Sequence, residues 1–136
     1  MYPEELCSPM RQDLTDVGFT ELKTPEDVVS MLNSKGSTLV VVNSVCGCAA
    51  GNARPGVKMA IQYNKKPDNL VTVFAGQDAD ATAKVREYML PYPPSSPSIG
   101  LFKDGEIIHV LERHHIEGRS ADMIAENLRE AFDSYC

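Results

Sequence analysis

The stretch Thr38-Leu39-Val40-Val41-Val42-Asn43-Ser44-Val45-Cys46-Gly47-Cys48 decides the fold of this chain. Its first six residues form a short, continuous run rich in β-branched side chains, which is typical of a central strand covered on both faces. The chain passes directly from this strand into a Cys-x-Cys pair. The next segment, residues 49–64, has helical composition interrupted by Gly51, Pro55 and Gly56, which predicts a kinked helix. Both cysteines are therefore expected where a strand ends and a helix begins.

The flanking segments extend this unit into a mixed sheet. Downstream, Asp78 and Ser120 are predicted helix caps, and Asp104-Gly105 is the turn of a predicted hairpin. Upstream, Ser8-Pro9 is the predicted start of a short helix. We predict one α/β domain over residues 1–136, with a sheet that is parallel early and antiparallel late. The expected elements are a helix from residue 8, a strand at 19–22, a helix at 25–34, strands at 38–43 and 70–75, a helix at 79–89, a proline-rich loop at 90–97, strands at 98–103 and 106–112, and a helix from residue 120.

Cys46 and Cys48 are the candidates for thiol–disulfide chemistry. The free N–H groups and the dipole at a helix start stabilise a thiolate, which lowers the pKa of a cysteine placed there. Cys46 is nearer the strand and is the predicted nucleophile, and Cys48 is the predicted resolving thiol. A bond between them requires a non-helical turn, which Gly47 permits. Because such a ring is tight and strained disulfides are easily reduced, we expect an oxidising or isomerase-like couple.

A metal or iron–sulfur site is the main alternative for this pair. Tetrahedral zinc needs further ligands, and the chain has no second paired spacing that would supply them. His114 and His115 follow the last predicted strand, where adjacent side chains point to opposite faces and cannot readily serve one site. We assign no metal ligand. Cys7 and Cys136 lie in terminal segments, and each is expected to be a buried small side chain or a free surface thiol, while His109 stands apart from the cysteine pair.

Composition argues against several classes of partner. The 136 residues include 13 Lys and Arg against 19 Asp and Glu, which gives a formal net charge of −6. Nucleic acids and anionic membranes are poor partners, because both are bound through clustered basic side chains. The amino terminus has neither the basic nor the apolar region of a secretory signal, and no apolar run approaches the roughly 20 residues of a membrane span. We therefore expect a cytoplasmic protein.

The motifs around the cysteines resemble those of a known family. The strand, the cysteine pair, the kinked helix with Pro55 and the segment Pro97-Ser98-Ile99-Gly100-Leu101-Phe102-Lys103-Asp104-Gly105-Glu106 are similar to the thioredoxin fold, in which a cis-proline opens a strand that ends in a similar hairpin. More specifically, the chain resembles the bacilliredoxins over nearly its whole length. The motifs that carry this resemblance are Val45-Cys46-Gly47-Cys48-Ala49, Asn52-Ala53-Arg54-Pro55-Gly56 and the loop Pro93-Pro94-Ser95-Ser96-Pro97.

This resemblance implies a thioredoxin-like mixed sheet flanked by helices, with an extra N-terminal helix that carries Cys7. It implies that Cys46 attacks the mixed disulfide between a cytosolic protein and bacillithiol, takes up the bacillithiol and is freed by Cys48 or a second thiol. Bacillithiol is then a co-substrate, no tightly bound cofactor is expected, and the partners are bacillithiolated client proteins and a recycling reductase. The resemblance also implies that Pro97 is cis and faces Cys46, and that the backbone of Ser96 can pair with an extended substrate segment.

Other features and functions stay open at this stage. Arg54 is a candidate electropositive neighbour of Cys46 that would attract an acidic adduct, and the alternative is a solvated helix charge. With Gly47, Ser96 and Pro97 it completes the candidate substrate-binding set. No Trp precedes the cysteines, so recycling by thioredoxin reductase is not expected. The competing functions are a protein disulfide isomerase, a metal or iron–sulfur binding module, and a redox-sensing partner protein.

Overall fold

A five-stranded sheet forms the middle layer of the computed structural model, which describes all 136 residues. The strand order is β1-β3-β2-β4-β5. β3 runs parallel to both β1 and β2, whereas β4 is antiparallel to β2 and to β5, as the sequence predicts. The strands are β1 Thr20–Glu21, β2 Ser37–Asn43, β3 Asn69–Phe74, β4 Ser98–Lys103 and β5 Glu106–Leu111.

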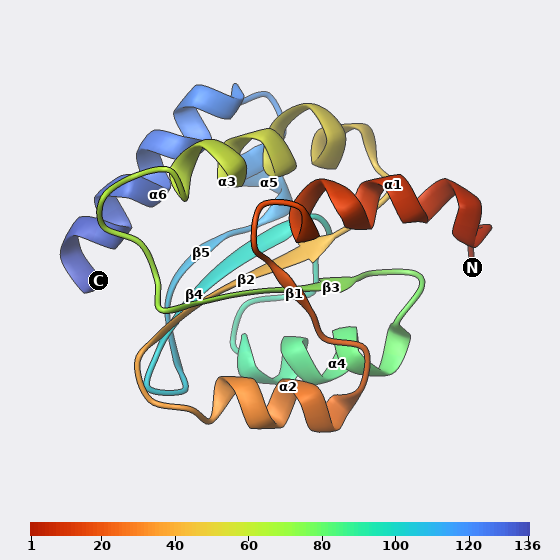
Figure 1. Cartoon of the computed structure of the whole chain (residues 1–136), viewed down its shortest axis with the longest axis horizontal. Coiled ribbons are helices and arrows are strands. Elements are labelled where there is room, and N and C mark those ends of the chain that lie inside the picture. Colours follow the sequence, from red (N-terminus) through yellow and green to blue (C-terminus); the bar gives the residue numbers. More distant parts are fainter.

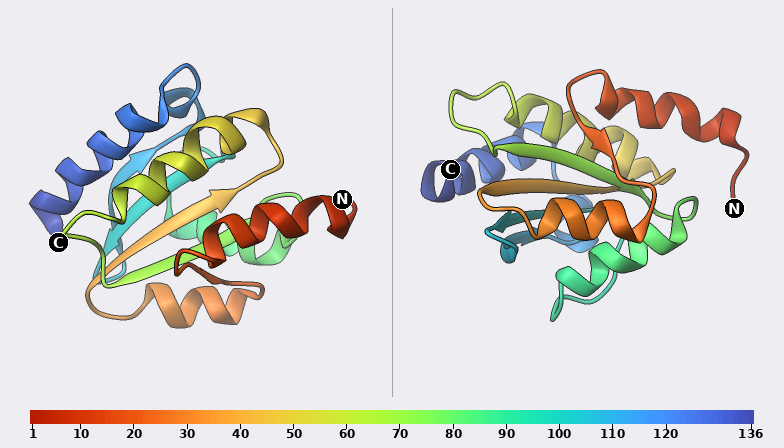
Figure 2. Two further views of the ribbon diagram at one scale, coloured as in Figure 1. Left: turned by 45° about the horizontal axis from the view of Figure 1, so that its top comes forward. Right: turned by 60° about the horizontal axis from the view of Figure 1, so that its bottom comes forward.

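Helices cover both faces of this sheet (Figure 1). α1, α3, α5 and α6 lie on one face, and α2 and α4 lie on the other; Figure 2 shows α3 and α6 side by side. No helix is both long enough and apolar enough to cross a membrane. The helices are α1 Glu4–Thr15, α2 Pro25–Leu32, a π-helical turn η1 Ala49–Ala53, α3 Arg54–Ala60, α4 Ala79–Tyr88, α5 Arg113–Ile116 and α6 Ala121–Tyr135.

β2 is the centre of the fold, and every one of its residues is buried. Leu39 and Val41 belong to the apolar cluster under α3 and α6, whereas Val40 and Val42 belong to the cluster under α2 and α4. Successive side chains of a strand point to opposite faces, so a strand between two helical layers carries consecutive apolar residues, here from Leu39 to Val42. This confirms the prediction made from the continuous apolar run.

The predicted turn and the predicted cap at Ser120 are confirmed. Asp104 and Gly105 both have positive φ, 51° and 86°, as the two central residues of a type I′ hairpin turn require. Ser120 accepts a hydrogen bond from the Met123 N–H at the start of α6, and Thr24 accepts one from the Asp27 N–H at the start of α2. These side chains satisfy backbone donors that a helix start leaves free.

α1 differs from the prediction because it begins at Glu4, so that Pro9 lies inside the helix and not at its first position. Acidic residues in the first turn favour this start. The helix also buries Cys7 and Leu14 against the rest of the molecule. This docking outweighs the one hydrogen bond that Pro9 cannot donate.

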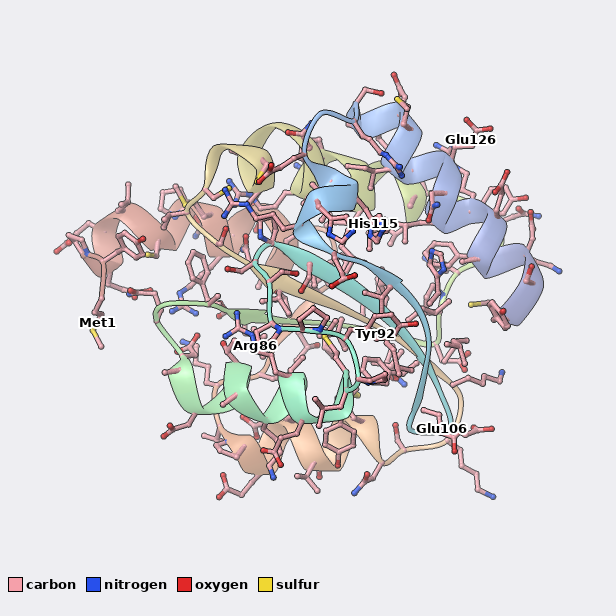
Figure 3. The ribbon with its side chains drawn as sticks, turned by 180° about the vertical axis from the view of Figure 1, so that it is seen from behind. Met1, Arg86, Tyr92, Glu106, His115 and Glu126 are labelled. Atoms are coloured by element: carbon pink, nitrogen blue, oxygen red, sulfur yellow. The ribbon has the colours of Figure 1, made fainter.

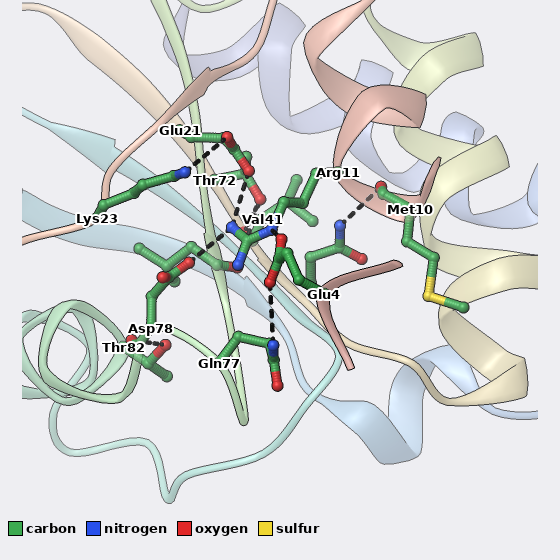
Figure 4. Close-up of polar contacts among 12 residues, drawn as sticks. Glu4, Met10, Arg11, Glu21, Lys23, Val41, Thr72, Gln77, Asp78 and Thr82 are labelled. Carbon is green, nitrogen blue, oxygen red and sulfur yellow. Dashed lines mark hydrogen bonds and ion pairs between the residues drawn. The ribbon is translucent and has the colours of Figure 1, made fainter. Parts of the chain in front are cut away.

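Arg11 fixes α1 to the sheet (Figure 4). Its Nε donates to Glu4 Oε1 at 2.7 Å, and its Nη1 donates to Glu21 Oε1 at 3.0 Å and to Asp78 Oδ2 at 2.7 Å. The guanidinium also lies 5.0 Å from the centre of the Phe74 ring. The Asp78 side chain therefore makes no cap hydrogen bond to α4, contrary to the prediction, because Arg11 occupies its carboxylate.

The helix α5 was not predicted. Glu112 and His115 form a reciprocal capping box, in which the Glu112 side chain accepts from the His115 N–H and His115 Nδ1 accepts from the Glu112 N–H at 3.0 Å. The segment therefore turns into a helix, where the prediction had adjacent side chains at the end of a strand. His114 and His115 lie together, with ring centres 4.0 Å apart, and do not point to opposite faces.

Candidate active site

Cys46 lies at the end of β2, where the chain turns into a helix. Its carbonyl accepts hydrogen bonds from the Ala49 N–H at 3.0 Å and the Ala50 N–H at 3.2 Å, so helical bonding starts at this residue. The π-helical turn η1 then leads into α3, with Pro55 within the first turn of that helix. The predicted kink is thus a π-turn, which accommodates the missing N–H of Pro55.

The pKa of Cys46 lies below its ordinary value of 9.0. Burial acts in the opposite direction and is the largest single influence. It is outweighed by hydrogen bonds to the sulfur from the Cys48 thiol and from the backbone N–H groups of Ala49 and Cys48, together with the positive charge of Arg113. The Cys48 N–H lies 3.3 Å from the Cys46 Sγ. These donors favour the thiolate of Cys46.

Cys48 has the opposite character. Burial raises its pKa, and its hydrogen bond to Cys46 and the charge on that sulfur raise the pKa further. Both thiols are free and partly exposed. One is therefore set up as a thiolate and the other as a protonated neighbour, a division that matches the predicted nucleophile and resolving thiol.

Gly47 is exposed and makes no use of the conformational freedom of glycine in this reduced state. Its φ is not positive, and a Cβ placed there would meet no atom within 4 Å. The non-helical turn expected at Gly47 is absent while both thiols are free. That expectation concerns the Cys46–Cys48 disulfide and stays a prediction for the oxidised protein.

Arg54 is buried, with a relative exposure of 5%, and it is not a solvated helix charge. Its Nη1 donates to Asn43 Oδ1 at 2.9 Å and to the Ser44 carbonyl at 3.0 Å, and its Nε donates to Asp13 Oδ2 at 3.2 Å. Arg54 therefore fixes the segment that precedes Cys46 through its hydrogen bonds to Asn43 and Ser44. It supports the site instead of facing a substrate, because its Nε and Nη1 donate hydrogen bonds to the protein itself.

Arg113 is the cation that acts on the thiols, and sequence reasoning missed it. Its positive charge lowers the pKa of both Cys46 and Cys48. Its backbone N–H donates to Ser95 Oγ at 3.2 Å, and its Nη1 donates to the Ser96 carbonyl at 3.1 Å. The only available signal was a basic residue just after the last predicted strand, and nothing in the sequence joined that position to residue 46.

The proline loop also reaches the site. The Ser96–Pro97 peptide bond is cis, as the family resemblance implies, and Leu90–Pro91 is a second cis bond. Ser96 lines the same cavity as Cys46, and Pro97 is buried beside it in sequence. The carbonyl of Ser96 is bonded to Arg113, whereas its N–H has no protein partner. Only the N–H is thus free to pair with an extended substrate segment.

A cavity of roughly 250 Å³ opens beside Cys46. It brings together residues from the amino terminus, the segments after β2 and β3, α4, the proline loop and α5. A larger hollow of about 640 Å³ between β1 and α2 contains no cysteine and no histidine. The residues that line the cavity beside Cys46 are Tyr2, Ser44, Val45, Cys46, Ala75, Gly76, Arg86, Ser96 and Arg113.

The one cluster of potential metal ligands comprises Glu112, His114 and His115, whose ligand atoms lie within 4.8 Å of one another. It includes neither Cys46 nor Cys48, so the arrangement gives no support to a metal site at the cysteine pair. Within the cluster, His115 Nδ1 already accepts the Glu112 N–H. That bond leaves the ring fewer free lone pairs for a metal ion.

The two remaining cysteines lie outside the site. Cys7 is fully buried in α1, where burial raises its pKa, and Cys136 is exposed at the end of the chain. These are the two environments that were expected for the terminal cysteines.

Comparison with solved structures identifies the fold. Mitochondrial thioredoxin 3 of Saccharomyces cerevisiae superimposes with a TM-score of 0.57 at 14% identity, covering 90% of this chain and 98% of that chain. Thioredoxin of Schistosoma mansoni gives 0.58 at 17% identity, covering 85% and 96%. The chain therefore has a thioredoxin fold, with a free cysteine pair after its central strand.

Curated relatives narrow this class. A bacilliredoxin of Cytophaga hutchinsonii is 58% identical over 133 residues, which are 98% of each chain. Another, of Bacillus cereus, is 55% identical over 137 residues and covers 99% of this chain and 95% of the relative. A family model described as disulphide isomerase matches residues 2–136. The chain therefore belongs to the bacilliredoxin family.

Proposed function

We propose that this protein removes bacillithiol from S-bacillithiolated proteins in the cytoplasm, as a single thioredoxin-like domain with no bound cofactor. The observation that carries the proposal is the asymmetry of the two thiols. Cys46 has a lowered pKa and lines an open cavity, and Cys48, with a raised pKa, donates a hydrogen bond to it. A thiolate with a protonated thiol beside it suits capture of an adduct followed by its release.

The proposed thiol–disulfide exchange takes place in two steps. In the first, the Cys46 thiolate attacks the bacillithiol sulfur of the mixed disulfide. A bond between Cys46 and bacillithiol forms, the bond to the client breaks, and the client leaves as a thiolate that takes a proton from water. The client cysteine is thereby reduced, and Cys46 carries the oxidised pair.

In the second step, Cys48 loses its proton and attacks the Cys46 sulfur, which forms a Cys46–Cys48 disulfide and expels the bacillithiol thiolate. Alternatively, a free bacillithiol thiolate attacks the bound bacillithiol sulfur, which yields bacillithiol disulfide and regenerates the Cys46 thiolate. Either disulfide needs two electrons from a recycling thiol reductase before the next cycle.

Mass spectrometry of the protein after incubation with a bacillithiolated client tests this function. The Cys48→Ala variant should accumulate one bacillithiol on Cys46 while the client regains its free thiol. The Cys136→Ala variant is the matched control, because it removes a cysteine that is exposed but outside the site. Transfer by Cys46→Ala, or failure of the wild type to take up any bacillithiol, would refute the proposal.

A disulfide isomerase is the second candidate, favoured by the description of the matching family model. The same thiolate would attack a non-native disulfide of a client, and the client's own thiols would then displace Cys46. Repair of a scrambled disulfide protein without any low-molecular-weight thiol distinguishes this function from bacillithiol removal.

A further inference from the structure

The cavity beside Cys46 is positively charged in a protein that is negative overall. Two of its nine lining residues are arginines, Arg86 from α4 and Arg113 from α5, and none is an aspartate or a glutamate. The chain as a whole has a formal net charge of −6. A positive site of this kind attracts anions to the thiol and raises their local concentration.

Arg86 has no carboxylate partner among the ion pairs of the chain. Its Nε is buried and is the only buried side-chain nitrogen or oxygen without a hydrogen-bond partner. A buried donor left without an acceptor costs free energy, and most such groups in proteins are satisfied. Figure 3 shows that Arg86 projects from α4 toward the loop that joins α4 to β4. Arg86 also lines the cavity, so its guanidinium is available to a ligand that brings an acceptor there.

Arg113 is held in position from the other side of the cavity. Its Nη1 donates to the Ser96 carbonyl at 3.1 Å, and its Nε is paired with Glu117, four residues along the chain. The side chains of Arg113 and Glu117 are about half exposed, 47% and 53%, so this ion pair is weak and can yield to a better acceptor. The remaining guanidinium nitrogen has no protein partner.

We propose that Arg86 and Arg113 bind the carboxylates of a low-molecular-weight thiol whose sulfur is bonded to Cys46. Guanidinium groups bind carboxylates through paired, charge-assisted hydrogen bonds, and two of them suit a ligand with two acids. A volume of roughly 250 Å³ fits the acid portion of a small thiol and is too small for a folded segment of a client protein. The proposal deepens the proposed function, because bacillithiol carries carboxylates, and it identifies the residues that would select this thiol.

A pair of small disulfides tests the proposal without using bacillithiol. Mercaptosuccinate disulfide carries two carboxylates on each half, and 2-hydroxyethyl disulfide carries none. In each case the Cys46 thiolate attacks one sulfur, forms the mixed disulfide and expels the other half as a thiolate. The measured quantity is the ratio of the second-order rate constants for the two reagents, with adduct formation on Cys48→Ala protein followed by mass.

The background Cys48→Ala protein should prefer the acidic disulfide. Adding Arg86→Gln should lower the ratio about tenfold or more, because charge-assisted hydrogen bonds between a guanidinium and a carboxylate are roughly twice as strong as neutral ones. The rate with the neutral disulfide should fall much less than the rate with the acidic one, because the neutral reagent has no carboxylate for Arg86 to bind. Arg86→Lys should restore part of the preference, since a lysine keeps the charge but not the two-pronged geometry. Arg119→Gln is the matched control, because Arg119 is exposed and does not line the cavity.

The Glu117→Gln variant tests the contribution of Arg113 separately. This change removes the competing carboxylate, so it should raise the preference for the acidic disulfide, whereas Arg113→Gln should lower it. Equal rates for the two disulfides in the background protein would overturn the proposal, as would a loss with Arg119→Gln that matches the loss with Arg86→Gln. Arginine variants that slow only a client with acidic residues near its cysteine would show that the cavity binds the client instead, and would also overturn it.

The outcomes separate this proposal from the proposed function. If mercaptosuccinate is preferred through the arginines but a bacillithiolated client transfers nothing, the carboxylate site stands and bacillithiol removal fails. If transfer from the client occurs and the ratio of the two disulfides is unaffected by Arg86→Gln, bacillithiol removal stands and the carboxylate site fails. Thermal unfolding of each variant shows that it is folded.

Discussion

Cys7 and Cys46 are the same residue type in two environments on one side of the sheet, and they differ in what surrounds the sulfur. Cys7 lies inside α1 and is fully buried, so burial and then the charge of Glu4 raise its pKa. Cys46 lies at the start of a helix, where backbone donors, a neighbouring thiol and Arg113 together outweigh the burial that opposes them. A nearby arginine does not suffice, since Arg11 also acts on Cys7 and its effect is smaller than that of burial.

The difference indicates that donors aimed at the sulfur decide which of the two thiols has the lowered pKa. Beyond the first turn of a helix every backbone N–H is bonded to a carbonyl, and Pro9, two residues after Cys7, has no N–H, so no backbone donor acts on the Cys7 sulfur. At the helix start after Cys46, the Cys48 N–H makes no hydrogen bond to a carbonyl and lies 3.3 Å from the Cys46 Sγ. Variants that change the surroundings of one of these two thiols at a time test this difference.

Alkylation should separate the two thiols most strongly. At neutral pH, iodoacetamide should modify Cys46 at least about a thousandfold faster than Cys7, because Cys7 can react only after α1 opens, at a cost of about 4 kcal/mol or more. Peptide mapping by mass over time measures both rates in one sample. Cys136 provides the control for an exposed thiol outside the site. Comparable rates for Cys7 and Cys46 in folded protein would contradict the comparison, whereas all sites should react in denaturant.

Much of this environment could be predicted from the sequence, because it is local. The apolar run of β2, the cysteines after it and the helical segment beyond them are contiguous, so the position of Cys46 at a helix start follows from neighbouring residues. Caps such as Ser120 and the Asp104-Gly105 turn are local signals of the same kind.

The rest of the site depends on contacts between distant parts of the chain. Arg113 reaches Cys46 only because the unpredicted helix α5 packs beside the proline loop. Arg54 was expected either to face an acidic adduct or to be solvated, and its buried position involves a hydrogen bond to Asp13, which lies 41 residues earlier in the chain. Arg86 is one more basic residue in the pattern of α4, and nothing local indicates that its Nε would be buried without a partner.

Removing Arg11 should weaken the protection of Cys7. Arg11→Met leaves three carboxylates without their shared cation, two of them largely buried, so the free energy of unfolding should fall by about 3 kcal/mol. For a domain of this size that corresponds to a drop in Tm of roughly 10 °C. Alkylation of Cys7 should accelerate, while alkylation of Cys46 should be nearly unchanged.

The matched control for Arg11 is Lys84→Met, which removes one partner of an exposed ion pair with Glu87 and should change Tm little. An Arg11→Met protein that unfolds at the wild-type temperature would show that α1 is held by its apolar face alone.

Removing Arg113 should reduce the difference in pKa between Cys46 and Cys7. The positive charge favours the thiolate, so Arg113→Gln should raise the pKa of Cys46 toward the ordinary value of 9.0. The thiolate is the reactive form, and the alkylation rate rises as pH increases through this pKa. The midpoint of the pH–rate curve should therefore move to higher pH, with a loss of about two- to fivefold at pH 7, because one exposed charge has a modest effect. A curve that coincides with that of Arg119→Gln would remove Arg113 from the set of groups that act on Cys46.

Changing Gly47 should have the smallest effect on the reduced protein and tests whether the helix start alone accounts for Cys46. Gly47 lies in helical backbone without positive φ, and an added methyl group meets nothing within 4 Å. Gly47→Ala should therefore raise the stability of the reduced protein by about 0.5 to 1 kcal/mol and change the alkylation rate of Cys46 less than about twofold. Cys46 and Cys48 must approach each other to form a disulfide, and this step is expected to require the non-helical turn at Gly47. The Cys48-dependent release of an adduct from Cys46 should consequently slow in Gly47→Ala, although the first attack by Cys46 does not. A release step as fast as in the wild type would mean that the turn forms without glycine, and that the backbone donors around Cys46 persist in both redox states.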